Sequence, residues 1–329
     1  MTSRHPSHHF LTNTSSAGST ILTGLRRSGF DTSCIITIPH RTAQYVSVND
    51  SSKNLVVAMA DMDIFTTSSE PASVAQWKHA LTGRPPKWVV VDANWTAQGI
   101  HAWIRNAAKV GSLVAFEPVS TVKSRRVFDS AHKLALFPHA SIALATPNML
   151  ELAAMHTSAR EHGHLDTTAW FDVVDAFDIR AGARAAFVRL ASADLTDLGV
   201  PVQAVQLLPF IPNLVVKLGD KGVLVVRLLK VGDELLEQEG EREYIVTRGR
   251  DGNHKGVGGV YMRMYPAVKA ETVVSVNGAG DTFLGVLVAE LAGRETCEVR
   301  VDEELVDRAQ RAAVLTLASE ASVSGDIGK

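Results

Sequence analysis

The residues with the clearest chemical potential form the short run Asn277-Gly-Ala-Gly-Asp281. Small residues let the backbone turn tightly, so the N–H groups of Gly278, Ala279 and Gly280 can point outward together and cradle an anion. A helix is predicted in the apolar run that follows, and its positive dipole end would add to the cradle. Asp281, at the mouth, could accept the proton of an alcohol that attacks a phosphate in line. The alternative is an ordinary strand-to-helix turn with Asp281 as its N-cap.

The elements that would position this run follow from the apolar pattern. Buried strands are predicted in residues 87–94, 112–120, 140–148, 213–226 and 271–276, where the fourth range holds two strands joined by a Gly-Asp-Lys-Gly turn. Helices are predicted in residues 100–111, 149–156, 282–293 and 306–321. Apolar strands that alternate with helices are typical of an α/β fold with a central, mainly parallel sheet flanked by helices.

Two regions differ from this pattern. Residues 42–62 contain two β-rich runs separated by a turn-forming cluster at 50–53, which predicts a hairpin. Residues 157–212 are weakly patterned and contain helical fragments, so we interpret them as helical packing or an insertion. The sequence contains no internal repeat, and we expect a single domain over residues 1–329.

Composition narrows the classes of partner. The 329 residues carry 33 basic and 35 acidic side chains without a long run of either sign, which argues against nucleic acid or an anionic membrane as a partner. No apolar stretch approaches the roughly 20 residues that span a bilayer. Cys34 and Cys297 are the only cysteines, which argues against a disulfide framework or a structural zinc site and favours a reducing, cytoplasmic compartment.

The first thirty residues allow two interpretations. They hold Arg4, Arg26 and Arg27, several Ser and Thr, and no acidic residue before Asp31, a composition that resembles an organelle-targeting segment. The alternative is an amphipathic helix that ends at Gly29. The helix fits better with the resemblance described next.

The run SVNGAGDTFLGVL, residues 275–287, resembles the C-terminal signature of the ribokinase family, also called the PfkB carbohydrate kinase family. The resemblance implies a ribokinase-like fold with a small β lid, and transfer of a phosphoryl group from ATP, with Mg2+, to a small-molecule sugar or nucleoside. It also implies that Asp281 is the catalytic base and that Gly278, Ala279 and Gly280 form the phosphate anion hole.

Two other segments match the same family in the expected order. In TPNMLEL, Asn148 and Glu151 match an Asn-x-x-Glu motif that influences magnesium and phosphate binding. Three residues apart on a helical turn, they would face the same way and could both hold metal-bound waters, although a capped helix start is the alternative. In VVKLGDKGVLV, Lys217, Gly219 and Gly222 match places where the family's chain approaches ATP, and a plain hairpin explains that pattern as well.

A narrower resemblance is to the pseudouridine kinase branch, which makes pseudouridine 5′-phosphate. The runs MADMDI (59–64), DAN (92–94) and EPVS-x-x-K (117–123) carry this resemblance. On the lid hairpin, Thr42 and Gln44 could touch the acceptor. The exposed edge of the lid could also pair two subunits into a homodimer.

The resemblance begins late, because residues 11–32 look like a segment that lies well inside the family's fold. The first strand, with a substrate-binding Asp, and a Gly-Gly motif of the lid would then be missing, which leaves an incomplete lid. These parts position the acceptor hydroxyl, and positioning contributes much of an enzyme's rate. Two alternatives stay open: a truncated, non-catalytic nucleotide-binding paralogue or fragment, and the same kinase chemistry on ribose, fructose or adenosine.

Overall fold

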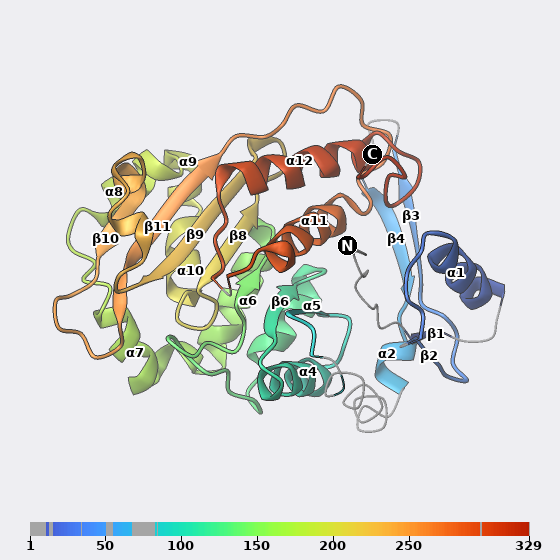
Figure 1. Cartoon of the computed structure of the whole chain (residues 1–329), viewed down its shortest axis with the longest axis horizontal. Coiled ribbons are helices and arrows are strands. Elements are labelled where there is room, and N and C mark those ends of the chain that lie inside the picture. The colour runs from blue at the N-terminus through green and yellow to red at the C-terminus, as the bar shows by residue number, and fades with distance from the viewer. Residues whose placement is uncertain are drawn as a thin grey trace.

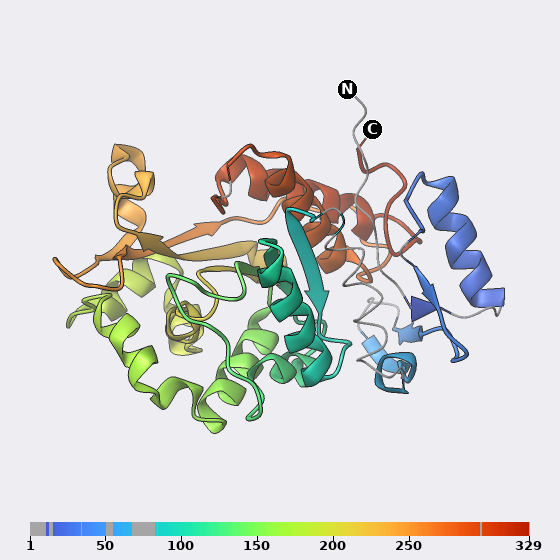
Figure 2. The same ribbon diagram turned by 60° about the horizontal axis from the view of Figure 1, so that its bottom comes forward.

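The protein is described by a computed structural model that places residues 11–12, 16–33, 35–50, 55–67, 83, 85–296 and 298–328. The predictions that rest on Cys34, on Cys297 and on the first ten residues fall outside these ranges. Residues Ser16–Arg27 form helix α1, where an amphipathic helix was one of the two interpretations. Figures 1 and 2 show a main body built around one sheet, with a separate pair of strands at the end of the molecule opposite β10.

The main sheet has the strand order β10-β11-β9-β8-β7-β6-β5. The strands are β5 (Trp88–Asp92), β6 (Leu113–Glu117), β7 (Leu144–Ala145), β8 (Asn213–Lys217), β9 (Val223–Lys230), β10 (Ile245–Arg248) and β11 (Val257–Tyr265). Pairing is parallel from β5 to β8 and antiparallel from β8 to β10. The sheet is therefore mixed, and not mainly parallel throughout, because the short turn after β8 leaves no room for a helical crossover.

Helices cover both faces of this sheet (Figure 2). On one face lie α4 (Ala97–Lys109), α6 (Met149–Glu161), α7 (Thr168–Asp175), α8 (Ala183–Leu190), α9 (Ala193–Asp197) and α10 (Val200–Leu207), and on the other α11 (Ala279–Gly293) and α12 (Glu303–Leu317). Shorter helices are α2 (Ile64–Thr67), α5 (Thr121–Ser124), η1 (Arg125–Phe128), η2 (His164–Asp166), η3 (Gly219–Lys221), η4 (Glu234–Leu236) and η5 (Glu239–Tyr244). Within the described ranges, no helix combines the length and apolarity needed to cross a bilayer.

Strand β8 shows why the sequence of the central strands is continuously apolar. Leu214 and Val216 belong to the core on the side of α4 and α6, whereas Val215, between them, belongs to the core on the side of α11 and α12. Successive side chains of a strand point to opposite faces, so a strand covered on both sides is apolar at every position. This arrangement brings the carboxyl ends of β5 to β8 to one edge of the sheet, which in open α/β sheets is the edge that binds ligands.

The strand predicted at residues 271–276 is wrong, because this segment joins no sheet. The N–H groups of Val274 and Ser275 instead donate to the carbonyl oxygen of Leu317, at 2.7 and 3.2 Å. The segment is therefore fixed to the end of α12 on its way into α11. A β-rich composition could not show that its backbone partner is a helix end.

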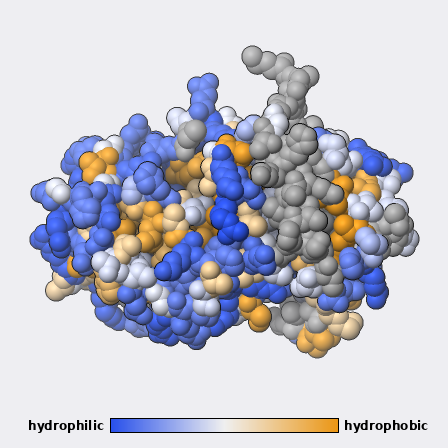
Figure 3. Space-filling model, turned by 90° about the horizontal axis from the view of Figure 1, so that it is seen from below, coloured by the Kyte–Doolittle hydropathy of each residue, from blue (hydrophilic) through white to orange (hydrophobic). Residues whose placement is uncertain are grey.

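A hairpin of β3 (Gln44–Asn49) and β4 (Leu55–Asp61) stands apart from the main sheet (Figure 1), and β1 (Leu11–Thr12) pairs with β2 (Ile36–Thr37). One face of the hairpin carries four exposed apolar side chains, which are those of Val46, Val48, Val57 and Met59. In Figure 3 hydrophobic residues gather at this end of the molecule, while much of the main body is hydrophilic. We call this hairpin the lid hairpin.

Candidate functional site

The N-terminal end of α11 is open. Gly278 precedes the helix with a φ of 78°, a left-handed conformation that favours glycine, and no side chain caps the helix. Thr282 N–H donates to Gly278 O at 2.8 Å, which leaves the N–H groups of Ala279, Gly280 and Asp281 without an acceptor in the helix. Together with the helix dipole, these groups form an anion-binding end. We call this end the cradle.

The C-terminal segment of the chain supports the cradle from behind. A methyl group on Gly278 would lie 1.7 Å from the carbonyl oxygen of Ser322, so glycine is required here for its conformation and for this close approach. In the helix pair, Thr282 Oγ1 lies 2.9 Å from Thr316 Oγ1, and Ser324 N–H donates to the same Thr316 oxygen. These contacts fix the turn at Gly278 against α12.

Lys217, at the end of β8, extends toward the cradle. A methyl group on Gly280 would place its carbon 3.1 Å from Lys217 Nζ, so the ammonium packs against the first turn of α11. Lys217 Nζ also lies 3.4 Å from both carboxylate oxygens of Glu117, at the end of β6. Thr146 Oγ1 donates to Glu117 Oε2 at 2.8 Å. Side chains at or just after the ends of the neighbouring strands β6, β7 and β8 thus meet at one point.

The end of β5 contributes a second polar group. Asp92 accepts the backbone N–H of Asn94 at 2.7 Å, and Lys123 Nζ donates to Asn94 Oδ1 at 2.6 Å. One guanidinium nitrogen of Arg126 contacts three successive carbonyl oxygens, those of residues 93, 94 and 95, at 3.0, 2.9 and 2.9 Å. The loop after β5 is therefore held rigidly by α5 and η1.

The charges of these groups influence one another. Burial raises the pKa of Asp92, and the positive charge of Lys123 opposes this. Burial likewise raises the pKa of Glu117, and Lys217 opposes it. Asp281 raises both pKa values further, because it adds a third negative charge. Carboxylates and a helix N-terminus at one place are a donor set that suits Mg2+ together with phosphate.

Asn148 and Glu151 form a capping box at the start of α6. Asn148 Oδ1 accepts the N–H groups of Leu150 and Glu151, both at 2.9 Å, and Glu151 Oε2 accepts Asn148 N–H at 2.8 Å. The two side chains therefore serve the helix start, as the alternative interpretation predicts. Glu151 still adds negative charge near Glu117, whose pKa it raises.

The predicted nucleotide turn has a structural reason for its glycines. Gly219 and Gly222 have φ values of 64° and 98°, and a methyl group on Gly222 would lie 2.1 Å from the carbonyl oxygen of Tyr265. Thr42, two residues before the lid hairpin, is buried, and Gln44, its first residue, is exposed opposite Asp61.

Sequence reasoning assigned no site role to five polar residues at this edge. These are Asp92, Asn94, Glu117, Lys123 and Thr146. Their positions could have indicated a site, because four of them lie near the ends of predicted strands, and ligands of open α/β sheets bind at the carboxyl ends of the strands. The runs DAN and EPVS-x-x-K, which carry the family resemblance, include all of them except Thr146.

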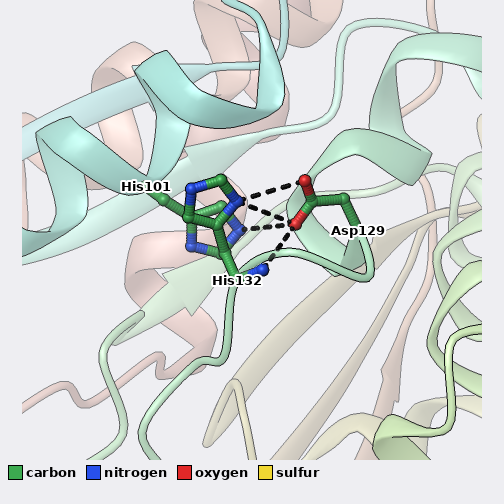
Figure 4. A group of neighbouring side chains, drawn as sticks. All are labelled: His101, Asp129 and His132. Carbon is green, nitrogen blue, oxygen red and sulfur yellow. Dashed lines mark hydrogen bonds and ion pairs between the residues drawn. The ribbon is translucent and has the colours of Figure 1, made fainter.

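A second titratable group lies where α4 meets the segment after η1 (Figure 4). His132 Nδ1 lies 3.0 and 3.1 Å from the two oxygens of Asp129, and His101 Nε2 lies 3.1 Å from the carbonyl oxygen of Val127. The two rings stack at 4.5 Å with an angle of 9° between their planes. A metal ion lies in the plane of each imidazole that binds it, and stacked parallel planes share no such point. This group is therefore a hydrogen-bonded cluster.

Parts of the chain are similar to known proteins. Residues 228–326 match the family model described as pfkB family carbohydrate kinase. The pseudouridine-metabolizing bifunctional protein of Schizosaccharomyces pombe is 28% identical over 291 residues, which are 87% of this chain and 35% of that protein. The chain thus spans about a third of the length of this curated relative.

Solved structures show the same architecture. The ribokinase of Arabidopsis thaliana, complexed with ribose and ATP, aligns with a TM-score of 0.58 and 14% identity over 97% of this chain and 79% of that one. The nucleoside kinase of Burkholderia thailandensis, in complex with inosine, aligns with a TM-score of 0.54 and 15% identity over 96% of this chain and 74% of that one. The predicted ribokinase-like α/β fold is confirmed, and the C-terminal part of the chain, residues 228–326, matches the PfkB carbohydrate kinase family.

Proposed function

We propose that this chain transfers the γ-phosphoryl group of ATP to a primary hydroxyl of a nucleoside, and that the nucleoside is pseudouridine. The observation that carries the proposal is the open start of α11, where unpaired N–H groups, the Asp281 carboxylate and the Lys217 ammonium meet. An open helix start stabilises the charge on a transferring phosphate, and a carboxylate beside it can take the proton of the attacking hydroxyl.

Each group has a separate task in this proposal. Asp281 is exposed and accepts the hydroxyl proton, while the backbone at Gly278, Ala279 and Gly280 binds the phosphate oxygens. The turn at residues 217–222 borders the nucleotide. Mg2+, when bound, neutralises charge on the triphosphate, and the carboxylates near Glu117 and the Asn148–Glu151 box would order its waters.

The choice of acceptor rests on two supports. The Schizosaccharomyces pombe relative, whose name gives pseudouridine as what it metabolises, matches 87% of this chain. The runs DAN and EPVS-x-x-K, which carry the resemblance to that branch, supply the Asn94–Lys123 pair at the sheet edge. Ribose, fructose and adenosine are the competing acceptors, and Thr42 and Gln44 are the lid residues proposed to touch the acceptor.

The test is ATP-dependent phosphorylation of pseudouridine with Mg2+, run beside uridine, adenosine, ribose and fructose. Asp281→Asn removes the base and keeps its shape, so turnover should fall about 100- to 10,000-fold while ATP still binds. Asp307→Asn, on the exposed side of α12, is the matched control and should keep full turnover. No turnover on any acceptor by folded protein that binds ATP would exclude the enzyme and favour a non-catalytic nucleotide-binding protein.

We also propose that two chains pair through the lid hairpin. Its exposed apolar face, with side chains 49–63% exposed, resembles a surface that a second copy would cover. Sedimentation of the purified chain should give a dimer, and Val48→Lys should give a monomer. A monomer at all concentrations would refute the pairing.

A further inference from the structure

The cradle is completed by a side chain from another layer of the fold. Lys217 extends from the end of β8, and its ammonium nitrogen lies 3.1 Å from the position that a Cβ atom of residue 280 would take, which is tighter than an ordinary contact. Gly280 has no unusual backbone angle that would require glycine. A methyl group at this position would displace the ammonium by a few tenths of an ångström, so the glycine allows the ammonium to lie in its present place.

Glu117 is fixed in the orientation that holds this ammonium. Its Oε2 accepts the hydroxyl of Thr146, and its Oε1 accepts the N–H of Val119 at 3.3 Å. Val119 adopts a φ of 65°, which is uncommon for a β-branched residue and bends the chain back toward Glu117. Thr146 is fully buried and Glu117 nearly so, which limits their movement.

The contact between the two charges is loose. Lys217 Nζ lies 3.4 Å from each Glu117 oxygen, whereas charge-assisted hydrogen bonds of this kind usually measure about 2.7–2.9 Å. An ammonium has three donors, so it can keep its attraction to Glu117 and still donate to another anion. The side chain remains partly exposed, at 19%, and is thus open on one side.

We propose that Lys217 is a phosphate-binding cation of the cradle, that Glu117 is its positioning residue, and that Gly280 is small in order to admit it. The inference rests on the proposed function and deepens it, since the ligand is a phosphate group of a nucleoside triphosphate. The backbone N–H groups supply directed hydrogen bonds, and Lys217 supplies the full positive charge that the helix start lacks.

Binding of inorganic tripolyphosphate and of MgATP, measured by calorimetry on the full chain at several salt concentrations, tests the proposal without turnover. Lys217→Met should weaken tripolyphosphate binding about 10- to 100-fold, because a hydrogen bond to a charged group is lost, and should flatten the salt dependence. Lys230→Met is the matched control, since Lys230 is an exposed lysine at the opposite end of β9, and it should bind as the wild type does.

Because Lys217→Met leaves the buried Glu117 carboxylate without its counter-charge, the double variant Lys217→Met with Glu117→Gln guards against misfolding. It should fold and bind as weakly as the single variant. Gly280→Ala should weaken tripolyphosphate binding several-fold in the wild type and much less in the Lys217→Met background, because the methyl group then meets no ammonium.

The outcomes separate the two proposals. Weaker binding in Lys217→Met, with Lys230→Met unchanged, supports the inference even if no acceptor is phosphorylated. Equal binding by wild type, Lys217→Met and Lys230→Met overturns the inference and leaves the kinase proposal standing. A wild-type chain that binds neither tripolyphosphate nor MgATP overturns both.

Discussion

Glu151 accepts the backbone N–H of Asn148 at 2.8 Å, and the Asn148 side chain accepts the N–H of Glu151 in return. The two residues of the Asn-x-x-Glu motif therefore satisfy each other, and each also fixes the start of α6. A helix start of this kind sits directly beside β8, since the backbone N–H of Lys217 donates to Pro147 O. The motif thus has a role in stability that can be separated from any role in metal binding.

Replacing Asn148 should reveal the structural role. Asn148→Ala removes the acceptor of two N–H groups, and we expect the free energy of unfolding to fall by about 1 kcal/mol in urea denaturation. Asn148→Asp keeps an N-cap and should retain the wild-type stability. If Asn148→Ala were as stable as the wild type but needed more Mg2+ for turnover, the side chain would act on the metal and not on the cap.

Two glycines, one just before α11 and one inside it, should respond in opposite directions to the same substitution. Gly278→Ala combines a left-handed φ with a clash against Ser322 O and should lower the free energy of unfolding by more than about 2 kcal/mol. Gly285→Ala lies inside the helix with open space around it and should stabilise by about 0.5–1 kcal/mol. Thermal unfolding of the two variants measures both effects, and equal shifts would contradict the geometry at Gly278.

The free energy of unfolding should fall in mild acid because the buried His101 resists protonation in the folded chain. Burial lowers the pKa of His101 from its usual value near 6.5 to about 4, with His132 and Arg105 acting in the same direction and Asp129 opposing them. Between pH 4 and pH 6.5 the unfolded chain therefore binds more protons at His101 than the folded chain does. The contribution of the neutral His101 to the free energy of unfolding is complete above pH 6.5 and is lost as the pH falls toward 4. Its full size is about 3 kcal/mol.

Urea denaturation at pH 7.5 and at pH 4.5 checks this expectation. His101→Gln can still donate to Val127 O but does not titrate, so its loss of stability between the two pH values should be smaller by about 2–3 kcal/mol. His139→Gln, at an exposed position, should retain the wild-type dependence. An unchanged dependence in His101→Gln would show that another group titrates.

Arg126 should prove necessary for the order of the loop after β5. The Lys side chain is one bond shorter than that of Arg, so the ammonium of Arg126→Lys should fall short of the three carbonyl oxygens, and we expect a loss of about 1–3 kcal/mol in the free energy of unfolding and faster hydrogen exchange in the loop around Asn94. Arg125→Lys, whose partner Glu161 is half-exposed, should change stability by less than about 0.5 kcal/mol. Equal exchange rates in the two variants would refute this role of Arg126.

The local parts of this fold could be predicted well from the sequence. Continuous apolar runs indicate β5, β6 and β8, because a strand covered on both faces needs apolar residues at every position. Helix α11 and the turn before it are equally clear, because a glycine-rich turn followed by a long apolar run is typical of a helix that starts without a side-chain cap. The same turn carried the prediction of a ribokinase-like fold, which the solved structures confirm, and it lies within the segment that matches the pfkB family model.

Contacts between distant segments could not be predicted in the same way. Residues 271–276 have a strand-like composition, yet their partner is the end of α12. Gly258 and Gly259 favour a loop by composition but lie in β11, where a methyl group on either would meet backbone atoms within 2.5 Å. Propensity describes a residue's own backbone, whereas these positions depend on what another segment brings next to them.

Glu117 and Lys217 are separated by 100 residues, and α11 joins them only later in the chain. Bringing three such segments together closes long loops, so the site exists only in molecules in which all three layers are in place. A molecule that lacks its last helix pair has the strand ends but no anion site. Tripolyphosphate binding therefore counts the fully folded molecules. A destabilising change in any of these layers lowers the fraction of molecules that can bind, without changing the affinity of each folded molecule.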